Sequence, residues 1–210
     1  MKVSILECQQ YELNLLKEKI RESLILIDAF DKIKPNGKVF IKLNLVGPFH
    51  PDLGITTHPM FVKAVIQLVK EKTNNILVGD NPATKELVFT LKKTGIYDVI
   101  IEENVTIVNN EELITISNSN FKIYQSFNVS KHMIDVDVMI NLPKLKTHAF
   151  AYMTGAQKNL FGLIYGLSKA SWHVKASHPL QFGEAINDLY GAIVEQFENK
   201  VLIHICDGIL

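Results

Sequence analysis

Basic and hydroxyl side chains gather in one short stretch of the chain. The run Asn141-Leu-Pro-Lys-Leu-Lys-Thr-His148 places two lysines and a histidine directly after an apolar segment. Pro143 restricts the backbone there. Ammonium, hydroxyl and imidazole groups that meet in this way would bind phosphate or carboxylate, or stabilise an enolate, and a desolvated lysine could act as a base. We assign catalytic roles to Lys144, Lys146 and His148, with a solvated basic loop as the plainer alternative.

The same stretch continues to Gly166 through a segment flanked by glycines. Lys158 and Asn159 follow Thr154-Gly155 by one helical turn, and Gly162 allows close approach of another backbone. We assign ligand binding to Lys158 and Asn159, and we expect a helix N-terminus near residues 149–154 to offer N–H groups to an anion. The spacings of the P-loop and of GxGxxG are absent.

Histidine supplies a further candidate for proton transfer or ligand contact. His173 follows the chain's tryptophan in a polar segment, and we assign it a catalytic role beside His148. A metal site made from His148, His173 and His178 stays an alternative. Because this spacing matches no standard zinc pattern, no metal ligand is assigned.

Polar residues also follow other predicted strands of the chain. The carboxyl ends of parallel strands meet at one edge of a sheet, where ligands gather, so these residues are candidates for ligand binding. They are Lys42, Asn44, Thr56, Thr57, Asp80, Asn81 and Asp207. Taken singly, such residues are ordinary turn formers and helix caps. Their coincidence on one expected edge favours a binding site.

Alternating strands and helices predict the elements that position these residues. Strands are expected at 3–8, 38–44, 75–79, 97–101, 105–108, 136–142 and 201–205, with helices at 12–30, from residue 59, and at 84–93, 150–163 and 182–197. This order is typical of an α/β fold with a mainly parallel sheet and helices on both faces. A β-hairpin of strands 113–117 and 121–125 is expected as an insertion over residues 113–127.

A single α/β domain over residues 1–210 is the expected organisation. The apolar ending Gly208-Ile209-Leu210 follows a predicted core strand directly, so we expect the natural chain to be longer. No signal peptide is apparent, and no apolar run reaches the roughly 20 residues of a membrane span. We therefore expect a cytoplasmic protein with no membrane partner.

Charge and cysteine content limit the possible partners. The formal net charge is zero, which argues against a nucleic-acid partner. Lysine makes up 21 of the 22 basic residues, so counts of lysine carry little information. Cys8 and Cys206 are isolated and cannot ligate an iron–sulfur cluster alone; buried thiols are the simplest expectation. A metal site from His204 and Cys206 stays an alternative.

The chain resembles the domain-of-unknown-function family 362, an uncharacterised iron–sulfur-centre-associated family. The matching residues are 41–45, 54–59, 78–82, 140–148, 154–162, His173 and 207–209. The chain has Lys42-Leu43-Asn44 where the family commonly has Lys-Pro-Asn. The resemblance implies a shared α/β fold and a shared polar site but no established reaction. Some members carry a ferredoxin-like module, which implies such a module or a redox partner as a possible partner.

Two functions follow from these observations. The first is an enzyme that acts on a small anionic substrate, bearing phosphate or carboxylate, in redox metabolism. The second is a non-catalytic module that binds such a ligand or docks a redox partner. An enzyme should hold at least one group with a strongly perturbed pKa in a closed cleft, whereas a docking module should expose a flatter basic patch. The cofactor is unknown.

Overall fold

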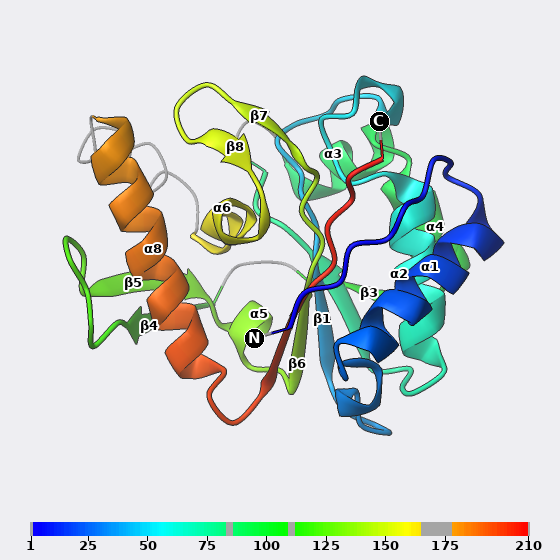
Figure 1. The fold of residues 1–210 in the computed structure, drawn as a ribbon, viewed down its shortest axis with the longest axis horizontal. Coiled ribbons are helices and arrows are strands. Elements are labelled where there is room, and N and C mark those ends of the chain that lie inside the picture. Colours follow the sequence, from blue (N-terminus) through cyan, green and yellow to red (C-terminus); the bar gives the residue numbers. More distant parts are fainter. Residues whose placement is uncertain (1, 83–85, 109–111, 165–177, 210) are drawn as a thin grey trace.

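A five-stranded parallel sheet forms the centre of the molecule. The computed structural model describes residues 2–82, 86–108, 112–164 and 178–209. The strand order is β3-β2-β1-β6-β9, and all neighbouring strands are parallel (Figure 1). The strands are β1 Val39–Lys42, β2 Ile76–Gly79, β3 Thr106–Ile107, β6 Val138–Asn141 and β9 Val201–His204. The predicted α/β class is confirmed.

Helices cover both faces of this sheet, as Figure 1 shows. One face carries α1 (Leu13–Leu26), α2 (Pro59–Lys70), α3 (Leu87–Lys93) and α4 (Ile96–Glu102). The other carries α5 (Lys131–Ile134), α6 (Ala156–Leu160), α8 (Pro179–Gln196) and the hairpin of β4 (Leu113–Ser117) and β5 (Ser126–Ser130). The short 3-10 turns are η1 (Phe30–Lys32), η2 (Pro51–Leu53) and η3 (Phe161–Leu163), and a second hairpin pairs β7 (Lys146–His148) with β8 (Tyr152–Thr154).

The central strand β1 divides its side chains between two cores. Val39 and Ile41 pack with α1 and α2, whereas Phe40 packs with α8 and the β4–β5 hairpin. Because side chains alternate along a strand, Lys42 lies on the same face as Phe40, the face that α6 covers. The last residue of β1 therefore carries a charge into the layer between the sheet and α6.

All strands of this sheet are parallel, but successive strands are added on opposite sides of β1. The chain moves from β1 outward to β2 and β3, and later returns to the other side of β1 with β6 and β9. In doubly wound sheets the crevice beyond the carboxyl ends of the two strands at this switch point is the usual ligand site. The fold therefore directs attention to the ends of β1 and β6.

Two predicted strands are wrong. Residues 3–8 form no strand, and Val3 and Ile5 are exposed, because this short apolar run has no strand beside it to complete its hydrogen bonds. Residues 97–101 belong to helix α4. There Ile96, Val99 and Ile100 are buried at helical spacing, and this periodicity outweighs their β-branched character.

The inserted hairpin is present, but its second strand lies later than predicted. β4 pairs with Ser126–Ser130 rather than with residues 121–125. The carboxylate of Asp188 on α8 accepts hydrogen bonds from the backbone N–H groups of Lys122, Ile123 and Tyr124, each at 2.8 Å. These N–H groups are therefore unavailable to a strand partner, and the segment forms the loop of the hairpin.

The helix predicted over residues 150–163 begins later than expected. Nδ1 of His148 accepts hydrogen bonds from the backbone of Phe150 (3.1 Å) and Ala151 (3.0 Å), which fixes the turn between β7 and β8. Tyr152 has a φ of 62°, outside the helical region. The predicted helix N-terminus at 149–154 is therefore absent, and α6 starts at Ala156.

We expect two leucines of α1, Leu16 and Leu26, to differ sharply in their effect on stability. Leu16 is 1% exposed, whereas Leu26, in the same helix, is 57% exposed. Leu16→Ala should lower the free energy of unfolding by about 2–5 kcal/mol, and the matched Leu26→Ala by about 0.5 kcal/mol or less. Urea unfolding followed by circular dichroism measures both. Equal losses would contradict the packing of α1 on this core.

Candidate functional site

Polar side chains form a continuous row at the carboxyl ends of three strands. Lys42 of β1 is in register with Asn141 of β6, which is in register with His204 of β9. Residues in one row of a parallel sheet point to the same face, so all three lie on the side that α6 covers. Burial lowers the pKa of His204. The sequence places Asn141 at the start of the stretch expected to carry the chemistry and His204 in an alternative metal site with Cys206, but neither is assigned as a ligand-binding residue.

Asn141 joins this row to helix α6. Its amide nitrogen donates to the Ala156 carbonyl (2.9 Å) and lies 3.0 Å from Nδ1 of His204. Its side-chain oxygen accepts from the amide of Asn159 at 2.7 Å, and Asn159 also donates to the Leu43 carbonyl at 3.1 Å. Asn159, predicted to bind a ligand, thus holds α6 against the ends of β1 and β6.

Lys42 forms a buried ion pair with Asp80, the residue that follows β2. Lys42 Nζ lies 2.6 Å from Asp80 Oδ1, and the side chains are 0% and 3% exposed. Asp80 also accepts from the backbone N–H groups of Leu45 (2.6 Å) and Asn81 (2.7 Å). Burial lowers the pKa of Lys42, and the Asp80 carboxylate opposes this effect. The pair joins the ends of β1 and β2 beneath η3.

Gly162 is what allows the chain to pass so close to this ion pair. A Cβ atom at this position would lie 2.6 Å from both Asp80 Oδ1 and Lys42 Nζ. No side chain fits at that distance. Gly162 therefore brings α6 and η3, with Lys158 one turn earlier, directly over the Lys42–Asp80 pair.

Lys158 and Lys146 complete a cluster of charges around the pair. Burial, and to a smaller extent repulsion from Lys42, lowers the pKa of Lys158 to about 8. Burial, and to a smaller extent repulsion from Lys158, lowers the pKa of Lys146 to about 8. The Asp80 carboxylate opposes the shift in both lysines. The Nζ of Lys146 donates to the Ile55 carbonyl, while that of Lys158 lies 5.1 Å and 5.8 Å from the ring centroids of Phe161 and Phe182.

A second buried ion pair takes Lys144 away from this cluster. Lys144 Nζ lies 3.1 Å from Asp207 Oδ1 and 2.7 Å from the Tyr11 hydroxyl, which donates to Asp207 at 2.8 Å. The other carboxylate oxygen of Asp207 accepts from the backbone N–H of His58 at 3.1 Å, and the His58 ring stacks on Tyr11 with centroids 3.7 Å apart. Burial raises the pKa of Tyr11 and lowers that of His58.

Several predicted ligand-binding residues instead tie the loops together. Asn44 accepts from the backbone N–H of Lys144 at 3.1 Å. The hydroxyl of Thr57 accepts from the backbone of Asn44 at 3.0 Å and donates to the Leu142 carbonyl at 2.7 Å. The hydroxyl of Thr56 is buried, with no hydrogen-bond partner among the described residues. Asn44 and Thr57 thus hold the loop before α2 against the end of β6.

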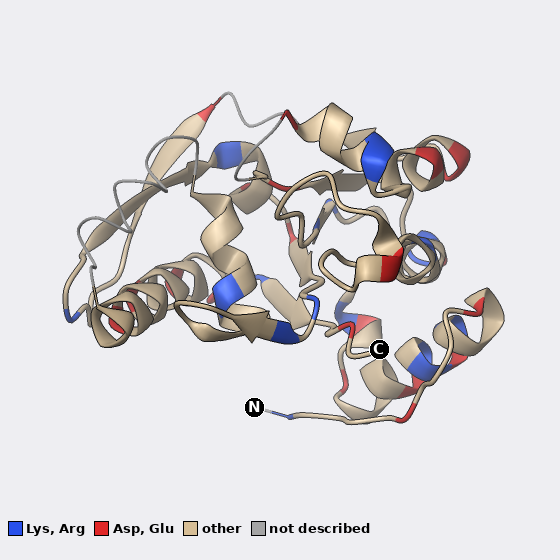
Figure 2. Cartoon of the chain, turned by 90° about the horizontal axis from the view of Figure 1, so that it is seen from above, with Lys and Arg blue, Asp and Glu red and all other residues tan. Residues whose placement is uncertain are grey.

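The predicted catalytic residues therefore separate into distinct places. Lys146 lies with Lys42, Asp80 and Lys158 in one cluster at the carboxyl ends of the strands. Figure 2 shows the molecule from above, with basic and acidic positions coloured along the backbone. Lys144 is held by Asp207, and His148 shapes the β7–β8 turn. His173 lies outside the described residues. Among the residues that are described, no group of three or more His, Cys, Asp or Glu side chains could hold a metal ion.

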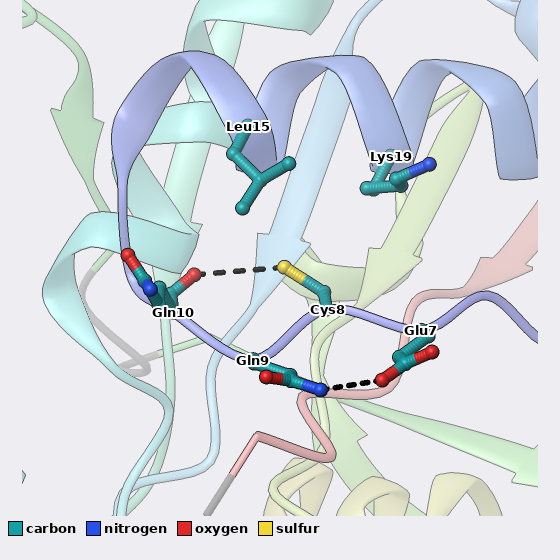
Figure 3. A pocket seen from close by; sticks show the side chains of 6 residues that line it. All are labelled: Glu7, Cys8, Gln9, Gln10, Leu15 and Lys19. Atoms are coloured by element: carbon teal, nitrogen blue, oxygen red, sulfur yellow. Dashed lines mark hydrogen bonds between the residues drawn. The ribbon is translucent and has the colours of Figure 1, made fainter.

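A surface hollow on the N-terminal segment is separate from this cluster (Figure 3). It is lined by Glu7, Cys8, Gln9, Gln10, Leu15 and Lys19. Its hydrogen bonds are local: the Cys8 thiol donates to the Gln10 carbonyl at 3.5 Å, and Gln9 donates to Glu7. Cys8 is half-buried there and Cys206 is exposed, so the expectation of two buried thiols is wrong. Because none of the predicted site residues lines it, the hollow is not part of the candidate site.

The fold and the strand-end cluster define a doubly wound α/β protein with a lysine-rich edge at its switch point. The chain belongs to the DUF362 family, described as a domain of unknown function, which it matches over residues 39–210. It is 34% identical over 212 residues to a thylakoid-associated protein of Synechocystis sp., covering 99% of this chain and 63% of that protein's length. No helix in the described part of the chain is long and apolar enough to cross a membrane.

Two solved structures share the fold at low sequence identity. The lactate racemase apoprotein from Thermoanaerobacterium thermosaccharolyticum superposes with a TM-score of 0.63 at 12% identity, over 91% of this chain and 48% of that one. A Thermotoga maritima protein gives a TM-score of 0.60 at 16% identity, over 96% of this chain and 53% of that one. The chain thus spans about half the length of these structures, and the likeness shows the fold.

A side chain at position 162 should disturb the Lys42–Asp80 pair. Gly162→Ala places a methyl group 2.6 Å from two buried charged atoms, so we expect a loss of about 1–3 kcal/mol in the free energy of unfolding. Gly183, inside α8, is a matched control because a Cβ there would meet no atom within 4 Å, and Gly183→Ala should be neutral or stabilising by up to about 1 kcal/mol. Thermal and urea unfolding compare the two variants. A neutral Gly162→Ala would contradict the close approach.

Removing the charge of Asp207 should destabilise the protein. Asp207→Asn leaves the buried ammonium of Lys144 without its carboxylate, at an expected cost of about 3–5 kcal/mol. Asp31→Asn is the control, because Asp31 is 93% exposed in its ion pair with Lys72, and it should cost about 1 kcal/mol or less. Urea unfolding at neutral pH measures both, and similar losses would argue against a structural role of the buried pair.

Proposed function

We propose that this chain is an enzyme that binds a small anionic molecule, bearing a carboxylate or phosphate, at the cluster around Lys146 and Lys158. The observation that carries the proposal is an excess of positive charge at the switch point. Asp80 is already paired with Lys42, and neither Lys146 nor Lys158 has a carboxylate partner among the described residues. An anion would neutralise this excess.

The altered protonation of the two lysines supports a catalytic role beyond binding. A pKa of about 8 for Lys146 and Lys158 leaves a useful fraction of each amine neutral near neutral pH. One lysine in its charged form could hold the anion while the other, as a free amine, accepts a proton. Lys42 and Asp80 hold the cluster in place and set its charge.

The fold neighbours suggest which anions to test first. Lactate racemase is named for a small carboxylate, and its structure shares the fold of this chain. The likeness transfers no activity, yet it makes lactate a reasonable first ligand, together with sulfate and phosphate. The family resemblance implies a place in redox metabolism, and the proposed function includes it.

We expect anion binding to fall as the pH rises through about 8. Both ammonium groups are charged below that pH and lose their protons above it, whereas lactate and sulfate keep their charge throughout. Calorimetric titration from about pH 6 to about pH 9 measures the affinity. Lys146→Met and Lys158→Met should each weaken binding by about tenfold, equivalent to roughly 1.4 kcal/mol.

The control for these variants is Lys72→Met. The Lys72 ammonium also lies over an aromatic ring, 4.5 Å from the centroid of Phe30, but beyond the other end of α2. Its loss should leave the anion affinity unchanged. Equal weakening in all three variants, or an affinity that does not respond to pH, would refute binding at the cluster.

A docking module for a redox partner, such as a ferredoxin-like module, is the second candidate. The β7–β8 hairpin exposes Tyr152 (77%) and Met153 (57%), and Leu145 before it is 45% exposed. Exposed apolar side chains beside Lys146 suit contact with another protein. Failure of every tested anion to bind to the folded protein would make docking the better proposal.

A further inference from the structure

Lys158 differs from the other lysines at the sheet edge in what surrounds its amine. Lys42 and Lys144 each donate to a buried carboxylate, and Lys146 donates to a backbone carbonyl. Lys158 donates to no group of the described residues, and the contacts of its amine there are with the rings of Phe161 and Phe182. Its amine is thus partly buried against apolar surface, and no described residue accepts a hydrogen bond from it.

A neighbouring cation adds to the effect of this apolar surface. Gly162 brings the Lys158 segment over the Lys42–Asp80 pair, so that the ammonium of Lys42 opposes a second positive charge nearby. Apolar surroundings and an adjacent cation are the two conditions that turn a lysine into a nucleophile, because both favour the neutral amine. Lys158 meets both conditions.

We propose that Nζ of Lys158 forms a Schiff base with the carbonyl group of a small 2-oxo acid, whose carboxylate is held by Lys146. This inference rests on the proposed function, since it uses the same anion-binding cluster. It goes further in naming one nucleophile, one covalent bond and one chemical class of substrate. Lys146 suits the carboxylate because its amine already donates one hydrogen bond to Ile55 and can offer its remaining protons to an anion.

The proposed step is balanced without any further reactant. The lone pair of the Lys158 amine attacks the carbonyl carbon, and the carbonyl oxygen takes up a proton to give a carbinolamine. The carbon–oxygen bond then breaks, the hydroxyl leaves as water with a proton lost from the nitrogen, and the nitrogen lone pair forms the second bond of C=N. Overall, one amine and one carbonyl give one imine and one water, with no oxidation or reduction.

The surroundings of Lys158 would stabilise the protonated imine that results. The imine carries a positive charge at the former amine nitrogen, which lies over two aromatic rings and within the field of Asp80. Lys42 and Lys144 are unsuitable as nucleophiles, because each amine already donates to a buried carboxylate. The cluster therefore offers one reactive amine with charged neighbours in supporting positions.

Reductive trapping of the imine tests the proposal on the intact protein. The whole chain is incubated with pyruvate or glyoxylate and sodium cyanoborohydride near pH 7, and the adduct is located by peptide mass mapping. An amine with a pKa near 8 holds roughly a hundredfold more neutral form at pH 7 than an ordinary lysine. The expected result is one adduct on the Lys158 peptide, in large excess over the Lys72 peptide.

Variants and competition separate the possible outcomes. Lys158→Arg should abolish the adduct, Lys72→Arg should keep it, and excess lactate, which has no carbonyl group, should slow its formation. Adducts spread evenly over surface lysines would overturn the imine. Calorimetric binding of lactate or pyruvate without any adduct would overturn the imine and leave the proposed function standing, whereas no binding and no adduct would reject both. Peptide mass mapping of the adduct on the unmutated protein tests the proposal even if the Lys158→Arg variant does not fold.

Discussion

Two opposite charges, Lys42 and Asp80, are held out of water at the switch point of the sheet. Removing such ions from water costs several kcal/mol for each, so the pair is stable only if the remaining hydrogen-bonding groups of both ions also find partners. Here they do: Asp80 also accepts hydrogen bonds from two backbone N–H groups, and Lys42 also donates a hydrogen bond to the Leu43 carbonyl. The ends of β1 and β2, the loop after β1 and the path of η3 all depend on this arrangement.

The lysines of the sheet edge serve two different purposes. Lys42 and Lys144 are fixed by carboxylates and join segments that are far apart in the sequence. Lys146 and Lys158 have no carboxylate partner among the described residues, and burial together with repulsion from neighbouring lysines lowers their pKa values. The structural and the proposed reactive groups are thus all lysines. They differ in whether the amine forms an ion pair with a carboxylate of the described residues.

The sequence predicts the sheet edge well because buried strands have a simple pattern. Apolar runs identify β1, β2, β6 and β9, and the polar residues at their ends follow directly. The partners of those residues cannot be predicted in the same way. Asp80 and Asp207 follow strands far apart in the sequence, and nothing local indicates which lysine each will bind. Short elements are also hidden: α4 has the composition of a strand, and the β7–β8 turn depends on a contact of His148.

The hydrogen bond between Tyr11 and Asp207 joins residues 196 positions apart. Closing so long a loop is slow and entropically costly, so such contacts form late in folding. Lys144 and the start of α2 depend on the same carboxylate of Asp207. During synthesis on the ribosome, this side of the sheet edge must therefore stay open until β9 and Asp207 have emerged, whereas the Lys42–Asp80 side can close earlier.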